Sequence, residues 1–202
     1  MNREQKEFIV IFYKLCQQNG RAYNNICPIA VTSQAVHESG WGNSTLASKH
    51  HNYFGLKAGK TWHGESVKLK TKEEYQKGKL VTIYADFRCY PNLESGVKGY
   101  YEFINTKRYA NLKNIKDPYT YVSLIKQDGY ATSTKYVTKV MKVVDTIKNY
   151  LIATDVIDGG YGNGEERVLK LTIAGYNYQN VQKCVNELLR DKIYELDISR
   201  NK

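Results

Sequence analysis

The chain has 202 residues and a formal net charge of +10, and 42% of its residues are hydrophobic and 25% charged. This composition is ordinary for a globular protein, and the length fits one good-sized domain, or one domain with a small module. It excludes a long disordered chain. No apolar run approaches the roughly 18 residues of a membrane helix, so we expect neither a membrane span nor stable membrane insertion.

The charge is uneven along the chain. Residues 1–152 carry 23 Lys and Arg against 12 Asp and Glu, whereas residues 153–202 carry 7 against 8. A basic surface on the first part attracts a polyanion, which leaves nucleic acid, a membrane surface and an anionic cell wall as candidates.

Metal sites and disulfides are not expected. The four cysteines have no CxxC pairing and no histidine at zinc spacing, and His50 and His51 also lack partners at metal spacing. We therefore predict no metal, no cofactor and no dense disulfide framework for Cys16, Cys27, Cys89 and Cys184.

Helical spacing dominates the first part of the chain. Apolar residues recur over 8–15, and a second helix is predicted from Pro28 to Gly40, with Glu38 in its final turn. Alternation between about 62 and 88 predicts a β-hairpin, in which Val81 and Phe87 share a face. Helical spacing returns over 93–104, 119–126 and 136–151. The prediction is a mainly α, α+β domain with a small β-lobe.

The composition changes near Thr154, where the basic excess ends and four glycines follow within residues 159–164. Beyond this point, one short helix is predicted to end at Gly175 and another to be capped by Asn177. We therefore divide the chain into a domain (1–153), a small helical module of two or three helices (154–190) and a charged tail (191–202).

Glu38 has the position of a general acid. A carboxylate near a helix C-terminus faces the negative end of the helix dipole, and the adjacent indole of Trp41 reduces its hydration, so both effects favour the protonated form. A carboxyl group that stays protonated near neutral pH can donate to a departing glycosidic oxygen.

Glycoside hydrolysis commonly needs a second carboxylate. Glu73 and Glu74 lie beside the predicted hairpin, flanked by Lys72 and Lys77, whose charges keep a carboxylate ionised. The doubled acid leaves open which of the two would serve. His37, next to Glu38, is predicted to face away from it.

Six motifs in order over about residues 5–152 resemble the N-acetylglucosaminidases of glycoside hydrolase family 73: "QAVHESGWGNSTLA", "HNYFGLKA", "TWHGESV", "ADFRCYPNLESGVKGYYEFI", "RYANL" and "DGYATSTKYVTKV". The resemblance implies a lysozyme-like fold and cleavage of the β-1,4 bond after N-acetylglucosamine in peptidoglycan. It places the family's acid on Glu38 and its second carboxylate on Glu74, with Glu73 as the alternative.

The resemblance also implies further site residues. Tyr130, in "GYAT", is the expected third active-site residue, although Ser133 stands where the family typically has Asp. The residues expected to stack on sugar rings or to close the site are Trp41, Tyr53, Trp62 and Tyr136.

The segment "DVIDGGYGNGEERVLKLTIAGYNYQNVQKCVNELL" resembles the CW-seven cell-wall-binding repeat of some phage lysozymes. It implies a three-helix module that recognises a muropeptide, with Tyr161, Arg167 and Tyr176 as contacts. Tethering through such a module raises the local concentration of an enzyme on its insoluble substrate.

The combined prediction is a peptidoglycan hydrolase, inverting, retaining or substrate-assisted. Glycan strands and muropeptides are its expected partners, and nucleic acid is not. A lysozyme or a lytic transglycosylase is the enzyme alternative. The alternatives that are not enzymes are a nucleic-acid binder and a catalytically inactive wall protein. The start of the chain does not resemble a signal peptide, so we expect a soluble phage endolysin made in the host cytoplasm that acts on the bacterial wall, although a mature autolysin fragment would look the same.

Overall fold

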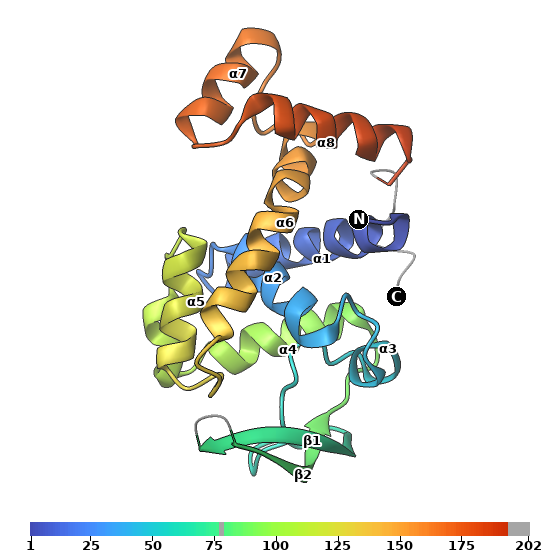
Figure 1. Ribbon diagram of the computed structural model, residues 1–202, viewed down its shortest axis with the longest axis vertical. Coiled ribbons are helices and arrows are strands. Elements are labelled where there is room, and N and C mark those ends of the chain that lie inside the picture. Colours follow the sequence, from blue (N-terminus) through green and yellow to red (C-terminus); the bar gives the residue numbers. More distant parts are fainter. Residues whose placement is uncertain (77–78, 194–202) are drawn as a thin grey trace.

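The structure, a computed structural model, describes residues 1–76 and 79–193, with the side chains of 72–80 left out. Helices form most of it, and a β-hairpin projects from one end (Figure 1). Within these ranges the elements are α1 (Arg3–Ala22), α2 (Pro28–Ser39), α3 (Thr45–His50), β1 (Ser66–Gln76), β2 (Lys79–Arg88), α4 (Leu93–Ile104), the 3-10 helix η1 (Lys107–Leu112), α5 (Pro118–Gln127), α6 (Tyr136–Ile157), α7 (Gly164–Ile173) and α8 (Tyr178–Arg190). The expected mainly α fold with a small β-lobe is confirmed.

Helix α2 lies at the centre of the larger part, and every residue from 30 to 36 is buried. Pro28 begins the helix, where its missing N–H costs nothing. Gly40 ends it in the left-handed conformation at φ 57°, and its N–H donates to the carbonyl of Val36. The predicted limits of this helix are therefore confirmed, with Glu38 in the last turn.

The main core lies between α1, α2, α4, α5 and the first half of α6. Its largest fully buried side chains include three tyrosines, Tyr100, Tyr101 and Tyr121, each 0% exposed. A buried phenol needs a hydrogen-bond partner, so the apolar interior also contains the hydrogen bonds of these three hydroxyl groups.

The hairpin pairs β1 with β2 in antiparallel register, with Ser66 opposite Arg88. The predicted alternation is present on β2, where Phe87 is buried and Tyr84 is 69% exposed. Asn52, itself buried, fixes the base of the hairpin because its Nδ2 donates to the carbonyl oxygens of Leu56 and Arg88, both at 2.9 Å.

The C-terminal module consists of the end of α6 with α7 and α8 (Figure 1). Its core includes Ile152, Leu171 and Leu188, together with Val10 from α1, so the two parts of the chain share apolar contacts. Helix α6 runs without a break through the expected boundary between residues 153 and 154. The parts are therefore joined by one helix, and the place of the boundary stays a prediction.

The hairpin and the module lie at opposite ends of the molecule, and α6 extends from the central helices to α8 (Figure 1). In the described ranges, every helix is too short or too polar to cross a lipid bilayer.

Candidate active site

The turn after Glu38 is held by a short hydrogen-bond network around Ser39. The Ser39 hydroxyl donates to Ala35 O at 2.6 Å and accepts from Gly42 N at 2.8 Å. The Ser39 carbonyl accepts from Ser44 N at 2.9 Å. These bonds fix the direction in which the chain leaves α2, and with it the orientation of the last helical turn that carries Glu38.

Glu38 combines accessibility with a desolvated carboxyl group. The residue as a whole is exposed to solvent. Protein atoms nevertheless crowd its carboxyl group, and this desolvation raises the pKa of Glu38 to about 7, although a hydrogen bond with Tyr136 acts in the opposite direction. The crowding of the carboxyl atoms, rather than the exposure of the whole residue, sets the protonation equilibrium. Glu38 is thus a carboxyl group that carries a proton near neutral pH and can be reached from outside.

Two tyrosines lie beside Glu38. The Tyr136 hydroxyl, at the start of α6, interacts with the Glu38 carboxyl, and beside the larger effect of burial this interaction lowers the pKa of Glu38 and raises that of Tyr136. The Tyr130 ring centroid is 6.1 Å from that of Tyr136, and its hydroxyl donates to Phe54 O at 2.7 Å. Burial first, and then the nearby charge of Glu38, raise the pKa of Tyr130 well above its ordinary value. The structure therefore brings together Glu38 of α2, Tyr130 of the segment after α5 and Tyr136 of α6.

Tyr136, one of the residues expected to stack on sugar rings or to close the site, is buried. Its side chain is only 3% exposed, so its ring has no free face for a ligand. Tyr53 is likewise only 6% exposed, and its ring packs edge-on against Phe12 with centroids 5.3 Å apart. Both rings belong to the core, and Tyr136 contacts the site through its hydroxyl alone.

Trp62 lies in the loop before β1, in a group of half-buried side chains. Its indole Nε1 donates to Glu65 O at 2.9 Å. The Arg88 guanidinium carbon lies 4.7 Å from the centroid of the Trp62 ring and 5.4 Å from that of Phe103. Phe103 in turn lies 6.3 Å from Tyr130, centroid to centroid. Contacts between side chains thus lead from Trp62 through Arg88 and Phe103 to Tyr130, which lies beside Glu38.

Arg88 and Phe103 were missed by the sequence reasoning. Both lie in the motif "ADFRCYPNLESGVKGYYEFI", which contributed to the resemblance but offered no spacing that links them to Trp62. Trp41, by contrast, is half-buried against the apolar cluster that includes Val36 and Ile147, and so part of its ring is used in packing.

Glu73 and Glu74 lie on β1, where they pair with Val81 and Leu80 of β2. Their side chains lie outside the described residues, so their distance from Glu38 and the choice between them stay open. In the part of the chain that is described, no group of three or more His, Cys, Asp and Glu side chains could hold a metal ion.

In the module, Arg167 is bound within its own fold. Its Nε donates to Gly162 O at 3.1 Å, and its terminal nitrogens donate to Gln182 Oε1 at 3.1 Å and Asn163 Oδ1 at 3.0 Å. This residue therefore ties the glycine-rich loop to α8. Tyr161 and Tyr176 are half-buried and pack against the core of the module.

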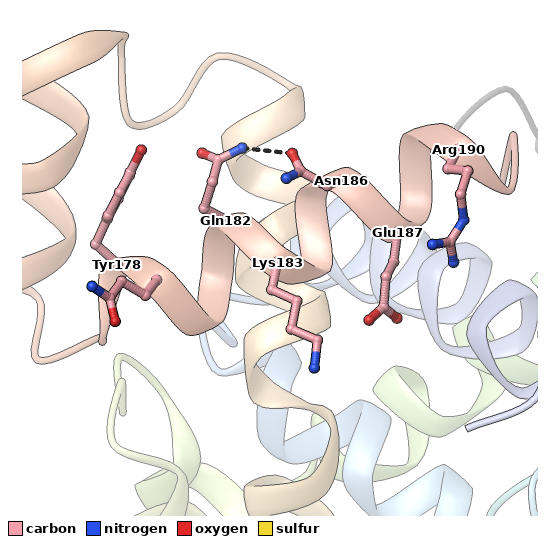
Figure 2. Close-up of a pocket in the computed structure, with 7 residues that line it drawn as sticks. Tyr178, Gln182, Lys183, Asn186, Glu187 and Arg190 are labelled. Carbon is pink, nitrogen blue, oxygen red and sulfur yellow. Dashed lines mark hydrogen bonds between the residues drawn. The ribbon is translucent and has the colours of Figure 1, made fainter.

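Side chains along one face of α8 line a shallow groove that sequence reasoning did not predict (Figure 2). Gln182 Nε2 donates to Asn186 Oδ1 at 2.9 Å, and Lys183 and Glu187 extend from the same helix (Figure 2). The side chains that line the groove end in polar groups, and they include both acidic and basic residues.

Two family models match the chain. The model described as mannosyl-glycoprotein endo-beta-N-acetylglucosaminidase matches residues 13–149, and the CW_7 repeat model matches residues 151–189. The two matches meet inside α6, so a family boundary falls within a continuous helix.

Curated relatives match part of the chain. Peptidoglycan hydrolase FlgJ of Pseudomonas aeruginosa is 33% identical over 126 residues, which cover 59% of this chain and 31% of the relative. Exo-glucosaminidase LytG of Bacillus subtilis is 31% identical over 127 residues, or 60% of this chain and 44% of the relative. A probable N-acetylmuramidase of Lactococcus lactis is 35% identical over 89 residues, or 44% of this chain and 20% of the relative. The chain spans less than half the length of these relatives.

Solved structures share the fold. A peptidoglycan hydrolase mutant from Sphingomonas sp. A1 matches with a TM-score of 0.63 and 26% identity, covering 69% of this chain and 92% of that one. The catalytic domain of the autolysin Auto from Listeria monocytogenes matches with a TM-score of 0.60 and 24% identity, covering 73% and 86%. At that identity the second match supports the fold alone.

Proposed function

Because the chain belongs to the glucosaminidase family and carries a CW_7 repeat over residues 151–189, we propose that it is a peptidoglycan hydrolase that cleaves the β-1,4 bond after N-acetylglucosamine. The observation that carries the proposal is Glu38, an accessible carboxyl group whose pKa burial raises to about 7. Relatives named peptidoglycan hydrolase and exo-glucosaminidase support the substrate class.

In the proposed mechanism, Glu38 protonates the glycosidic oxygen as the bond to the anomeric carbon breaks, and its carboxylate then accepts the hydrogen bond of Tyr136. The opposite face of the sugar is assisted by Glu74, with Glu73 as the alternative, or by the acetamido group of the substrate itself. Carboxylates about 5 Å apart would retain the anomeric configuration, and those about 6.5–9.5 Å apart would invert it.

Other proposed roles follow the positions of the side chains. Tyr130 would orient the substrate beside Glu38. Trp62, and the part of the Trp41 ring that is not used in packing, would contact pyranose rings.

Mass spectrometry of the fragments released from purified peptidoglycan tests this function. A new reducing N-acetylglucosamine end supports it, whereas a reducing N-acetylmuramic acid end would establish a muramidase and an anhydro end a transglycosylase. The muramidase outcome is a defined alternative because some relatives are named probable N-acetylmuramidases. Glu38→Gln is the matched inactive variant, and full activity in that variant would overturn the role of Glu38.

We further propose that the module binds muropeptides of the wall, in line with its match to the CW_7 repeat. Arg167 would shape the glycine-rich loop, and Tyr161 and Tyr176 would offer their exposed edges. Sedimentation of the Glu38→Gln protein with insoluble walls measures binding without digestion. An added Arg167→Ala change should weaken binding, and unchanged binding would remove Arg167 from the proposal.

A phage endolysin is the biological setting that we propose for this pair of modules. Expression inside a susceptible bacterium should then be tolerated until the membrane is permeabilised, after which the culture should lyse. Lysis without permeabilisation would instead favour an exported autolysin.

A further inference from the structure

Behind Glu38, buried polar side chains form a continuous chain of hydrogen bonds. Gln34 Nε2 donates to the Tyr136 hydroxyl at 2.9 Å, and the Tyr100 hydroxyl donates to Gln34 Oε1 at 2.8 Å. The Tyr100 and Tyr121 hydroxyls are 3.1 Å apart, and Asn25 Nδ2 donates to Tyr121 at 2.9 Å. We call this set the buried chain; its members are Asn25, Tyr121, Tyr100, Gln34 and Tyr136.

The buried chain joins separate parts of the fold. Its members come from α2, α4, α5, the start of α6 and the turn before α2, and none is more than 4% exposed. Polar groups that are buried this completely hold fixed orientations, since a broken link leaves a donor or acceptor without a partner. The choice of donor and acceptor at one end of the buried chain therefore determines the donors and acceptors along the rest of it.

Glu38 determines which group donates and which accepts in each hydrogen bond of the buried chain. An ionised carboxylate only accepts, so Tyr136 must donate to it. A hydroxyl has a single proton, so the Tyr136 oxygen must accept from Gln34 Nε2, which leaves Gln34 Oε1 to accept from Tyr100. Tyr100 has then used its proton, and Tyr121 donates to it. The amide donor of Asn25 at the far end agrees with this direction.

We propose that Tyr100 is a positioning residue for the reaction: through the amide of Gln34 it orients the hydroxyl of Tyr136 as a donor toward Glu38. The inference rests on the proposed function, in which Glu38 is the acid. Without the Tyr100 hydroxyl, the Gln34 amide is free to turn, and its oxygen then competes with Glu38 for the proton of Tyr136.

Other titratable groups surround the end of the buried chain at Tyr136. Tyr130 approaches from the segment after α5, and the His37 ring on α2 lies 5.8 Å from that of Tyr136, centroid to centroid. Burial and then the charge of Lys139 on α6 lower the pKa of His37. Because none of these residues changes in the variants compared below, their effects on Glu38 cancel in the comparison.

Tyr101 provides a matched control. It is next to Tyr100 and equally buried, but its hydroxyl donates to Cys16 O at 3.0 Å, outside the buried chain. Tyr100→Phe and Tyr101→Phe therefore remove the same atom from the same core. Only the first change interrupts the route to Glu38.

The experiment compares the pKa of Glu38 in the two variants by 13C NMR of protein labelled at glutamate, with Glu38→Gln used to assign the signal. Tyr100→Phe should raise this pKa by about one unit, because the carboxylate loses a donor. It should also lower kcat on purified glycan about tenfold, as expected for a weakened donor to developing charge. Tyr101→Phe should leave both values at those of the wild type.

Equal pKa values of Glu38 in Tyr100→Phe and Tyr101→Phe would overturn the proposal. If Tyr100→Phe does not fold, Tyr100→Met removes the same hydroxyl, leaves the Gln34 amide equally free to turn and should also raise the pKa of Glu38; no change in that variant is equally decisive against the proposal. The titration needs no substrate. Lysis by Glu38→Gln would thus refute the proposed function, while the pKa comparison would still test the buried chain.

Discussion

Lys6 of α1 and Glu187 of α8 form an ion pair between the two ends of the sequence, with Nζ 3.0 Å from Oε2. The same ammonium group lies 3.1 Å from Asp191 Oδ2, and only 8% of the Lys6 side chain is exposed. Further along α1, Tyr13 and Gln17 donate to the carboxylate of Asp155 on α6, at 2.9 Å and 2.8 Å. The C-terminal module is thus docked on α1 by polar contacts as well as by the shared helix.

We expect Lys6→Met to loosen this docking. The change removes the cation while it keeps an apolar stem, and the thermal midpoint should fall by about 2–4 °C at pH 7. Arg3→Met is the control, since among the described residues Arg3 forms its ion pair with Glu7 one turn away and its side chain is 62% exposed; its midpoint should hardly change. Equal losses in both variants would show that the Lys6 pair does not hold the module.

The pH dependence of this docking has a defined sign. Hydrogen bonds from Tyr150 and then Lys6 lower the pKa of Glu187 from its ordinary 4.5. A lowered carboxyl pKa contributes stability above the ordinary value, and this contribution is lost as the pH falls through the lowered one. Wild type and Lys6→Met should therefore differ in thermal midpoint above about pH 4.5 and converge in more acidic solution. A difference that persists at pH 2 would contradict this.

The activity should follow the titration of Glu38. Its pKa is raised to about 7 by burial, so the acid is present below that pH and is lost as the pH rises through it. The value of kcat/KM should thus decline on the alkaline side with a midpoint near 7. Glu38→Gln should lower kcat by about 10³-fold. The control is Glu102→Gln, which should keep the wild-type profile because its side chain is 53% exposed and, in the described part of the chain, forms its ion pair with Lys98.

The stability of the wild type should also fall as the pH rises through the titration range of Glu38. A carboxyl whose pKa is raised by folding destabilises the native state once the pH exceeds its ordinary value, 4.5 for Glu38. Glu38→Gln removes that charge. The thermal midpoint of the variant relative to the wild type should therefore increase between about pH 4.5 and pH 7 and stay constant above. A difference that does not depend on pH would contradict a raised pKa.

The sequence predicted the helices well because their ends carry local signals. Pro28 and Gly40 delimit α2, and the Asn177 side chain caps α8 by accepting from Asn180 N, as predicted. The end of α6 was harder to place. The apolar spacing predicts a helix only as far as Leu151, and the change in composition near Thr154 suggests a boundary there, whereas the helix continues to Ile157.

The site could be predicted only in part. The place of Glu38 in a final helical turn is a local property, and Tyr130 came from the resemblance. Which face of a ring is covered depends on residues far away in sequence, so the burial of Tyr53 and Tyr136 could not be read from their own motifs. The contact between Arg88 and Trp62 likewise arises because the hairpin brings its two ends together.

A substitution at Trp62 tests whether the aromatic side chains beside the hairpin contact the substrate. If it contacts a sugar ring, Trp62→Ala should raise KM about tenfold through the loss of stacking. The pKa of Glu38, measured by the same NMR titration, should not change, because Trp62 has no contact with the buried chain among the described residues. Tyr84→Ala is the control on the hairpin, where the side chain is 69% exposed. An unchanged KM in Trp62→Ala would remove Trp62 from the substrate site.

A substitution at Gly42 tests whether the geometry of the turn after α2 controls the position of Glu38 and, through it, kcat. Its φ is +80°, and a Cβ at this position would lie 2.8 Å from the nearest ring atom of Phe8. Gly42→Ala should therefore strain the turn by about 1–3 kcal/mol and, by displacing the Ser39 network, lower kcat more than it raises KM. Gly59→Ala is the control, since an added Cβ there has no described atom within 4 Å and the backbone is not left-handed. If both variants keep the wild-type kcat, the geometry of this turn does not control the position of Glu38.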